Sequence, residues 1–298
     1  MDFLLKLKDL DRRIIFVFIA LAVAIPMLLK MTFPVVPGKN VTSLFDFLDK
    51  LPIGTQTIMS FDYDPASMPE LHPAAIALLA HMFRRQLKPI CMANWPVGGE
   101  MAKGALASAT EIFRNTPESF YQGKNKPAPA SKDLVAGRDY VNLGYKPGGI
   151  PHIKGLISDF MKPYPIDMEG NSTGKMEIFN LPSGAKFTLK DAGVIVSFTA
   201  GTGGIEAYIA LGSEHKCVMG ASCTSVNIPK FYTFLQTKQL IGLVGGLPGA
   251  AECEAVIEQP GPATRGIAPQ SIAHLVIMIF ITIGNIAYLY EKSRKKKA

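Results

Sequence analysis

The sequence has little of what metal sites and catalytic motifs are built from. Its 298 residues include four cysteines, five histidines and one tryptophan. Cys91, Cys217, Cys223 and Cys253 match no zinc-binding spacing, and the histidines are scattered, so no metal site and no cofactor is predicted. Outside the cytoplasm Cys217 and Cys223 are close enough in sequence to form a disulfide, but Cys217 also lies in an apolar run where a free buried thiol is common.

Nucleotide-binding and serine-hydrolase signatures are also absent. The chain has no P-loop GK[ST], and Gly201-Thr-Gly203-Gly204 fails the full G-x-G-x-x-G spacing because position 206 is Glu. Ser222 lies in Gly-Ala-Ser-Cys-Thr, which lacks the second glycine of a nucleophile elbow. These absences argue against a P-loop ATPase and a serine hydrolase.

The chain also lacks a basic surface for nucleic acid, despite a net charge of +7. Residues 1–13 contribute +1, Lys30 adds +1, and the tail from Glu291 contributes +4. Only +1 is left for the whole middle of the chain, so no nucleic-acid partner is expected.

Two long apolar runs stand near the ends of the chain. They predict transmembrane helices over residues 14–36 and 266–290, since about 20 helical residues cross a hydrocarbon core of about 30 Å. No A-x-A cleavage site follows the first run, so we expect an uncleaved anchor. The alternative is a buried core helix at each end of the domain.

Basic residues flank both runs on their outer sides. Because such residues stay on the cytoplasmic side, residues 1–13 and 291–298 are predicted to be cytoplasmic. Two spans with both ends inside would place residues 37–265 outside the cytoplasm. Tyr288 and Tyr290 stand where an interfacial aromatic belt would lie.

Short apolar runs alternate with helical patterns in the middle of the chain, which predicts a doubly wound, Rossmann-like α/β domain with a mostly parallel sheet. Strands are predicted at 57–62, 89–95, 139–145, 191–198, 217–222 and, as a strand or buried loop, 239–246. Helices are predicted at 43–50, 72–86, 100–113, 152–161, 205–211, 228–236 and 248–258, and residues 162–186 are predicted to be irregular.

In such a sheet ligands bind at the carboxyl ends of the strands. Polar and glycine-rich segments follow several of the predicted strands and are expected to converge on one edge. The candidate ligand-binding residues are Asp62, Asp64, Trp95, Lys146, Gly201, Gly203, Gly204 and Ser222.

Asp62 and Asp64 form an Asp-x-Asp pair at the end of the first predicted strand. The pair resembles the haloacid dehalogenase-type phosphatases, a resemblance that covers only these few residues. It implies that one carboxylate attacks phosphorus and that both help to hold Mg²⁺. The alternative is an Asx turn that leads into the following helix.

The other candidates also have two interpretations each. The glycines at 201–204 precede a helix and suit an anion at its N-terminus, or they form a tight turn. Lys146 either meets an anionic ligand or is a solvated loop lysine, and Trp95 either stacks on a ligand or covers the sheet edge.

Three functions remain open. The first is a non-enzymatic structural or assembly component that forms homo-oligomers at a lipid bilayer. Its candidate contacts are Asn285 in the second span and the glycine-rich run 240–251, which is either domain core or a subunit contact. The second is a domain that binds or senses a small polar or anionic ligand. The third is a metal-dependent hydrolase that uses Asp62 and Asp64.

Overall fold

A computed structural model describes residues 12–121, 127–201 and 203–295. The chain divides into two compact units, Val35–Ala263 and the terminal segments up to residue 34 and from residue 264. Each unit is described by itself. Residues 1–11 and 296–298, which carry part of the predicted flanking charge, and Thr202 of the glycine-rich segment lie outside the described residues.

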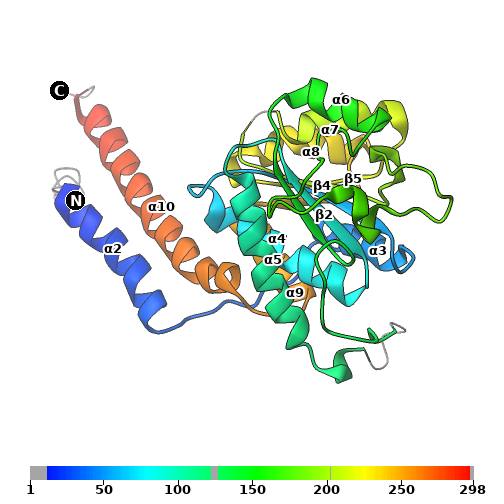
Figure 1. The fold of residues 1–298 in the computed structure, drawn as a ribbon. Coiled ribbons are helices and arrows are strands. Elements are labelled where there is room, and N and C mark those ends of the chain that lie inside the picture. Colours follow the sequence, from blue (N-terminus) through cyan, green and yellow to red (C-terminus); the bar gives the residue numbers. More distant parts are fainter. Residues whose placement is uncertain (1–11, 122–126, 202, 296–298) are drawn as a thin grey trace. The chain divides into compact units, whose positions relative to one another are not determined.

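The α/β unit is built on one sheet of six parallel strands in the order β3-β2-β1-β4-β5-β6, which confirms the predicted Rossmann-like α/β fold (Figure 1). The strands are β1 Gln56–Asp62, β2 Lys88–Ala93, β3 Val141–Tyr145, β4 Ile195–Thr199, β5 Met219–Cys223 and β6 Leu243–Gly245. Every residue of β1, β4 and β5 is buried. Helices on both faces explain why these strands are continuous apolar runs.

Helices cover the two faces of the sheet in two groups (Figure 1). One face carries α3 Lys39–Lys50, α4 Met68–Arg84, α5 Gly98–Arg114 and α9 Gly246–Val256. The other carries α6 Gly149–Ser158, α7 Ile205–His215 and α8 Ile228–Gln236. Short 3₁₀ turns lie at η1 Glu118–Phe120, η2 Thr173–Lys175, η3 Glu177–Phe179, η4 Leu189–Asp191 and η5 Ser225–Asn227.

Several predicted boundaries were wrong. The strand predicted at 191–198 begins at Ile195, because Thr188 and Asp191 form a reciprocal capping box that holds η4. The helix predicted at 72–86 begins at Met68, where Pro69 suits the first helical turn. The strand-like run at 239–246 contributes only the three residues of β6.

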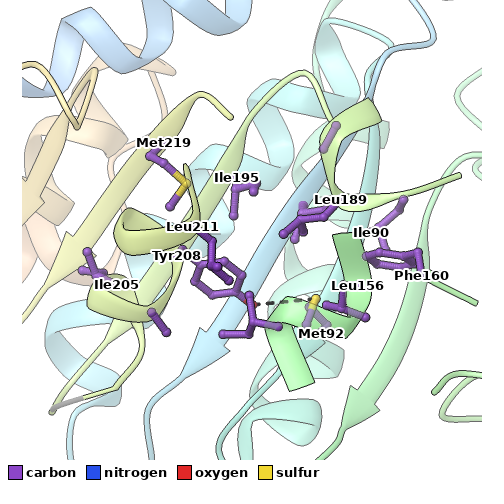
Figure 2. Close-up of a cluster of buried hydrophobic side chains, with 14 of the residues drawn as sticks. Ile90, Met92, Leu156, Phe160, Leu189, Ile195, Ile205, Tyr208, Leu211 and Met219 are labelled. Carbon is purple, nitrogen blue, oxygen red and sulfur yellow. Dashed lines mark hydrogen bonds between the residues drawn. The ribbon is translucent and has the colours of Figure 1, made fainter. Parts of the chain in front are cut away.

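The core under α6 and α7 is a large cluster of buried apolar side chains (Figure 2). Tyr208 of α7 lies within this cluster beside the apolar strand residues. The irregular segment predicted at 162–186 also contributes to the core, because Phe160, at its entrance, packs against Tyr164, Phe179 and, just beyond it, Phe187. The segment is therefore packed although it has little regular structure.

The chain enters and leaves the α/β unit at the amino edge of the sheet. A Cβ at Gly242, directly before β6, would lie 2.8 Å from the carbonyl oxygen of Asn40 in the first turn of α3. At the end of α4, Arg84 donates from Nη1 to the carbonyl oxygen of Ile257, just after α9, at 2.7 Å. The strand-end loops therefore lie at the edge opposite both junctions.

The terminal unit contains α2 Arg12–Leu28 and, from Thr264 on, α10 Pro262–Lys295. One helix of the described chain, Pro262–Tyr290, is long and apolar enough to cross a membrane, with a mean hydropathy of 2.1 and 6% of its most apolar window buried. The predicted first span, 14–36, is helical only to Leu28, because Lys30 adopts a left-handed conformation (φ 49°) that ends the helix.

Within this unit α2 and α10 contact each other along one stripe each. The rings of Phe18 and Phe280 meet edge to face at 5.8 Å. The less exposed positions recur at helical spacing: Ile15, Ile19, Ala22 and Pro26 on α2, and Val276, Phe280, Ile283 and Ala287 on α10. The remaining surface of α2 and, from His274 on, of α10 is largely exposed and apolar, whereas Ala263, Ala268 and Pro269 near the start of α10 are buried.

Candidate functional site

The order in which the chain adds strands to the sheet reverses between β1 and β4. β1 leads to β2 and β3 on one side, and β4 leads to β5 and β6 on the other. Asp62 and Thr199, the last residues of β1 and β4, are partners in register. Ligands of open α/β sheets bind in the crevice at this position, so this is where a site is expected.

Asp62 fills this position and is almost fully buried, with 4% of its surface exposed. Its Oδ1 accepts the backbone N–H of Asn94 at 2.7 Å, and its Oδ2 accepts the hydroxyls of Ser60 at 2.8 Å and Ser197 at 3.3 Å. Burial raises the pKa of Asp62 above its ordinary value, and these hydrogen bonds offset only part of that rise. Both carboxylate oxygens are therefore occupied by the protein itself.

The hydrogen-bond network continues into the core through Tyr208. Its hydroxyl donates to Ser60 Oγ at 3.0 Å, accepts from Asn94 Nδ2 at 3.1 Å, and lies 3.8 Å from the Met92 sulfur (Figure 2). Asn94 Nδ2 also lies 3.2 Å from Ser60 Oγ. Burial, followed by the charge of Asp62, raises the pKa of Tyr208. The phenol stays neutral and serves to fix the network.

The glycine-rich segment lies against this network. A Cβ at Gly204 would be 2.5 Å from Thr199 Oγ1 and 3.2 Å from Asp62 Oδ2, so only glycine allows α7 to begin here. Gly203 has a φ of +94°, a conformation that favours glycine, and Gly201 has open space around it. Glu206 in the first turn of α7 forms an ion pair with Lys230. A carboxylate at this helix terminus disfavours phosphate and supports the tight-turn interpretation.

The two aspartates of the Asp-x-Asp pair have different local roles. Asp64 Oδ1 accepts the backbone N–H of Ser67 at 3.2 Å, as expected for an Asx turn into α4. Between them, Tyr63 points to the α4 face, where its hydroxyl lies 2.8 Å from His72 Nδ1. Within the described part of the chain no three His, Cys, Asp or Glu side chains gather closely enough to hold a metal.

The remaining predicted residues are dispersed. Trp95 is 42% exposed in the turn between β2 and α5. The Lys146 backbone N–H donates to Ala93 O at 3.1 Å, and its ammonium lies 5.9 Å from the centre of the Tyr164 ring. Ser222 is buried in register with Phe198 and Val244, on the face of the sheet opposite Asp62. The structure thus brings Asp62 and Gly204 together but separates Ser222 from them.

Sequence reasoning missed the side chains around Asp62. Asn94 directly follows β2, and strand alternation could have placed Ser60, two residues before Asp62 in β1, on the same face as Asp62. Tyr164 could not have been found, because it comes from the irregular segment. Its hydroxyl lies 2.9 Å from His152 Nε2, and burial raises the pKa of Tyr164 and lowers that of His152.

Some loops and helix starts that follow the carboxyl ends of the strands carry exposed apolar side chains. They follow β1, β2, β3 and β5 and are Met68, Trp95, Val97, Ile150 and Val226. Val226 is the most exposed of them, at 84%. Exposed apolar side chains also occur elsewhere on the α/β unit, among them Ile53, Val135 and Ile166, and singly scattered ones are normal on a protein surface.

A cavity of about 620 Å³ lies elsewhere, between α5 and the outer edge of β3. Charged side chains of both signs line it, with Lys103 and Arg114 opposite in charge to Glu111 and Glu169. Leu106, Val141 and Met168 supply apolar walls. None of the residues predicted as ligand-binding lines this cavity.

Comparison with known proteins leaves the function to be argued from this geometry. No protein-family model matches the sequence, and no match was found among the curated proteins or the solved structures.

Proposed function

We propose that the chain is a membrane-anchored, non-enzymatic assembly component that forms homo-oligomers. In this proposal α2 and α10 both span the bilayer, both termini are cytoplasmic and the α/β unit lies outside the cytoplasm. The proposal joins the observed fold to the charge pattern of the sequence.

The observation that carries the non-enzymatic assignment is the closed crevice at the ends of β1 and β4. The buried Asp62 carboxylate accepts three hydrogen bonds from the protein. Ser60, Ser197, Thr199 and Tyr208 around it are also buried. A nucleophile or a metal ligand needs free lone pairs directed at a substrate or an ion, and three of the about four lone pairs of this carboxylate accept hydrogen bonds from the protein.

The exposed surfaces of the two terminal helices support the membrane anchor. The stripe on α2 that contacts α10 is narrow, and the rest of both helices exposes apolar side chains, as expected for helices surrounded by lipid.

Self-association in the membrane tests the proposal. Two full-length copies with different affinity tags are expressed together, solubilised in mild detergent, and purified through one tag. We expect the second tag to be retained. A parallel sample, in which membranes that each hold one tagged copy are mixed only after solubilisation, controls for exchange in detergent. Loss of the second tag from the co-expressed sample would contradict the proposal.

A second candidate function, small-ligand binding, is favoured by the cavity beside β3. Its mixed charges suit a small zwitterionic molecule with an apolar part, held between Arg114 and Glu111. Native mass spectrometry of the protein released from gentle detergent would show such a molecule as a retained mass. Arg114→Ala should abolish that mass, whereas Arg138→Ala, outside the cavity, should leave it unchanged.

The third function, metal-dependent hydrolysis, has a direct test. Turnover of a generic phosphoester with Mg²⁺ is measured for the parent chain and for Asp62→Asn. The proposal predicts no turnover by either protein, and Mg²⁺-dependent turnover that is lost in the variant would support the hydrolase.

A further inference from the structure

This inference rests on the proposed membrane anchor and assembly role, and concerns the surface through which copies meet. α10 has a second stripe, on the side turned away from the residues that α2 partly covers. It consists of His274, Met278, Ile281, Asn285 and Tyr288, all exposed. Their separations of 4, 3, 4 and 3 residues are the spacing of a helix-packing seam.

The stripe concentrates polar groups within the apolar helix. Thr282, beside it, donates its hydroxyl to Met278 O at 2.8 Å and is therefore satisfied within its own helix. The Asn285 amide makes no hydrogen bond within the described residues, and its side chain is exposed on α10. Hydrocarbon offers neither a donor nor an acceptor to such a group.

Asn285 lies too deep in the proposed span for its amide to reach water. Lys292 begins the basic segment about 10 Å further along the helix, at about 1.5 Å per residue. Because helical Cα–Cβ bonds tilt toward the N-terminus, the amide points away from that end and deeper into the span. An asparagine is too short to reach back to the head groups.

We infer that Asn285 and its stripe form the contact between α10 helices of two copies of this chain. The contact of α2 with α10 lies along the opposite stripe, so the partner must come from another molecule. Copies in one bilayer share their topology, so their α10 helices meet in parallel with Asn285 at equal depth. An amide is both donor and acceptor, which lets two copies of Asn285 pair with each other.

Repulsion between the basic tails opposes this pairing but lies outside the hydrocarbon. The tail from Glu291 has a net charge of +4 and would lie among head groups, where salt and anionic lipid screen it. The amide pair is not screened in this way, because it lies in the hydrocarbon.

Cysteine cross-linking in membranes locates the contact. Single cysteines are placed in the full chain at Ile281, on the Asn285 stripe, and at Ile283, on the stripe toward α2. We expect oxidation to give a covalent dimer for Ile281→Cys and only background, set by the parent chain with its native thiols, for Ile283→Cys. Equal cross-linking at both positions, or at neither, would overturn the inference.

Replacing the amide tests its chemistry. In lipid vesicles, energy transfer between labelled full-length copies at varied protein-to-lipid ratio gives the dissociation constant. Asn285→Leu should weaken association about five- to thirtyfold, the effect of one interhelical hydrogen bond of about 1–2 kcal/mol. Asn285→Gln should retain association, and Thr282→Val should match the parent because that hydroxyl is bonded within its helix.

The outcomes separate this inference from the proposed function. Association that Asn285→Leu leaves unchanged overturns the Asn285 contact while the assembly role stands. A parent chain that stays monomeric at every ratio overturns both. Energy transfer that appears only when another membrane protein is added would assign the stripe to that protein and overturn the inference.

Discussion

Glu252 accepts the backbone N–H of Gly38 at 2.8 Å, and so ties the start of α3 to α9. Two residues further along α9, Glu254 accepts the N–H groups of Gly261 and Ala263 at 2.8 and 3.0 Å. Both carboxylates occupy helix N-termini, where negative charge is favourable. One helix of the sheet's outer layer therefore holds both places at which the chain enters and leaves the α/β unit.

Removing the Glu254 carboxylate should lower the free energy of unfolding more than removing the Glu252 carboxylate does. Glu254 is 3% exposed and accepts two N–H groups, so Glu254→Ala should lower the free energy of unfolding by about 2 kcal/mol, and Glu252→Ala by about 1 kcal/mol or less. Denaturation of the full chain, followed by the fluorescence of its single tryptophan, measures both. Equal losses would show that Glu254 does not hold the junction.

Asp62 should act as a buried structural carboxylate. Asp62→Ala leaves the Asn94 N–H and the hydroxyls of Ser60 and Ser197 without their acceptor. This change should lower the free energy of unfolding by about 2–4 kcal/mol. Asp62→Asn keeps an acceptor for the Asn94 N–H and loses only the acceptor of the two hydroxyls, so it should lower the free energy of unfolding by less. If both variants lose the same stability, the network does not depend on this acceptor.

The same variant tests the charge of Asp62. Burial raises its pKa, so the folded state binds a proton more tightly than the unfolded state does. Protonation of Asp62 therefore stabilises the folded state. This contribution is fully present below the pKa of Asp62 in the unfolded state, about 4, and is lost as pH rises through its higher pKa in the folded state. The stability of the parent relative to Asp62→Asn should therefore fall as pH rises above about 4. A difference that does not change with pH would exclude a raised pKa.

His72 should have the opposite dependence on pH. Burial lowers its pKa, so its contribution to stability is present above the unfolded pKa of about 6.5 and is lost as pH falls through the lower folded pKa. His72→Asn keeps an acceptor near Tyr63 but does not titrate. The stability of the parent relative to this variant should decrease on acidification below about pH 6.5, as measured by denaturation across that range. A constant difference would show that His72 titrates alike in both states.

Two glycines of α5 provide a matched pair. A Cβ at Gly98 would lie 1.9 Å from the carbonyl oxygen of Phe61, so Gly98→Ala should destabilise the fold by about 3 kcal/mol. A Cβ at Gly104 would lie no closer than 3.6 Å to His72, and Gly104→Ala should be neutral or stabilising by up to about 1 kcal/mol. Thermal unfolding of both variants compares them, and a well-tolerated Gly98→Ala would contradict the close approach of α5 to β1.

The alternation of strands and helices could be predicted from the sequence, because β1, β4 and β5 are buried on both faces and are therefore largely apolar. Where local hydrogen bonds compete with the apolar pattern, as Thr188 and Asp191 do before β4, the sequence-based boundary was displaced. The helix break at Lys30 was missed for a similar reason, since apolar character continues beyond it while the backbone turns.

The candidate site was less accessible to sequence reasoning. The position of Asp62 at the strand end followed from the pattern of β1, but its saturation by Ser60, Ser197 and Asn94 depends on three different strands and their loops. Ser222 was placed with the same group because its segment follows a strand, whereas its side chain points to the other face. Side-chain direction at a strand end depends on register, which the sequence does not state.

The mass of the full-length protein, solubilised in mild detergent and measured by native mass spectrometry, tests the proposed assembly role most directly. One chain has a mass of 32.3 kDa. The proposal predicts a defined integral multiple of this mass, which persists on dilution. The inferred Asn285 contact further predicts that Asn285→Leu shifts the mass toward that of a single chain. A single-chain mass for the parent under the gentlest conditions that keep it folded would contradict the proposal.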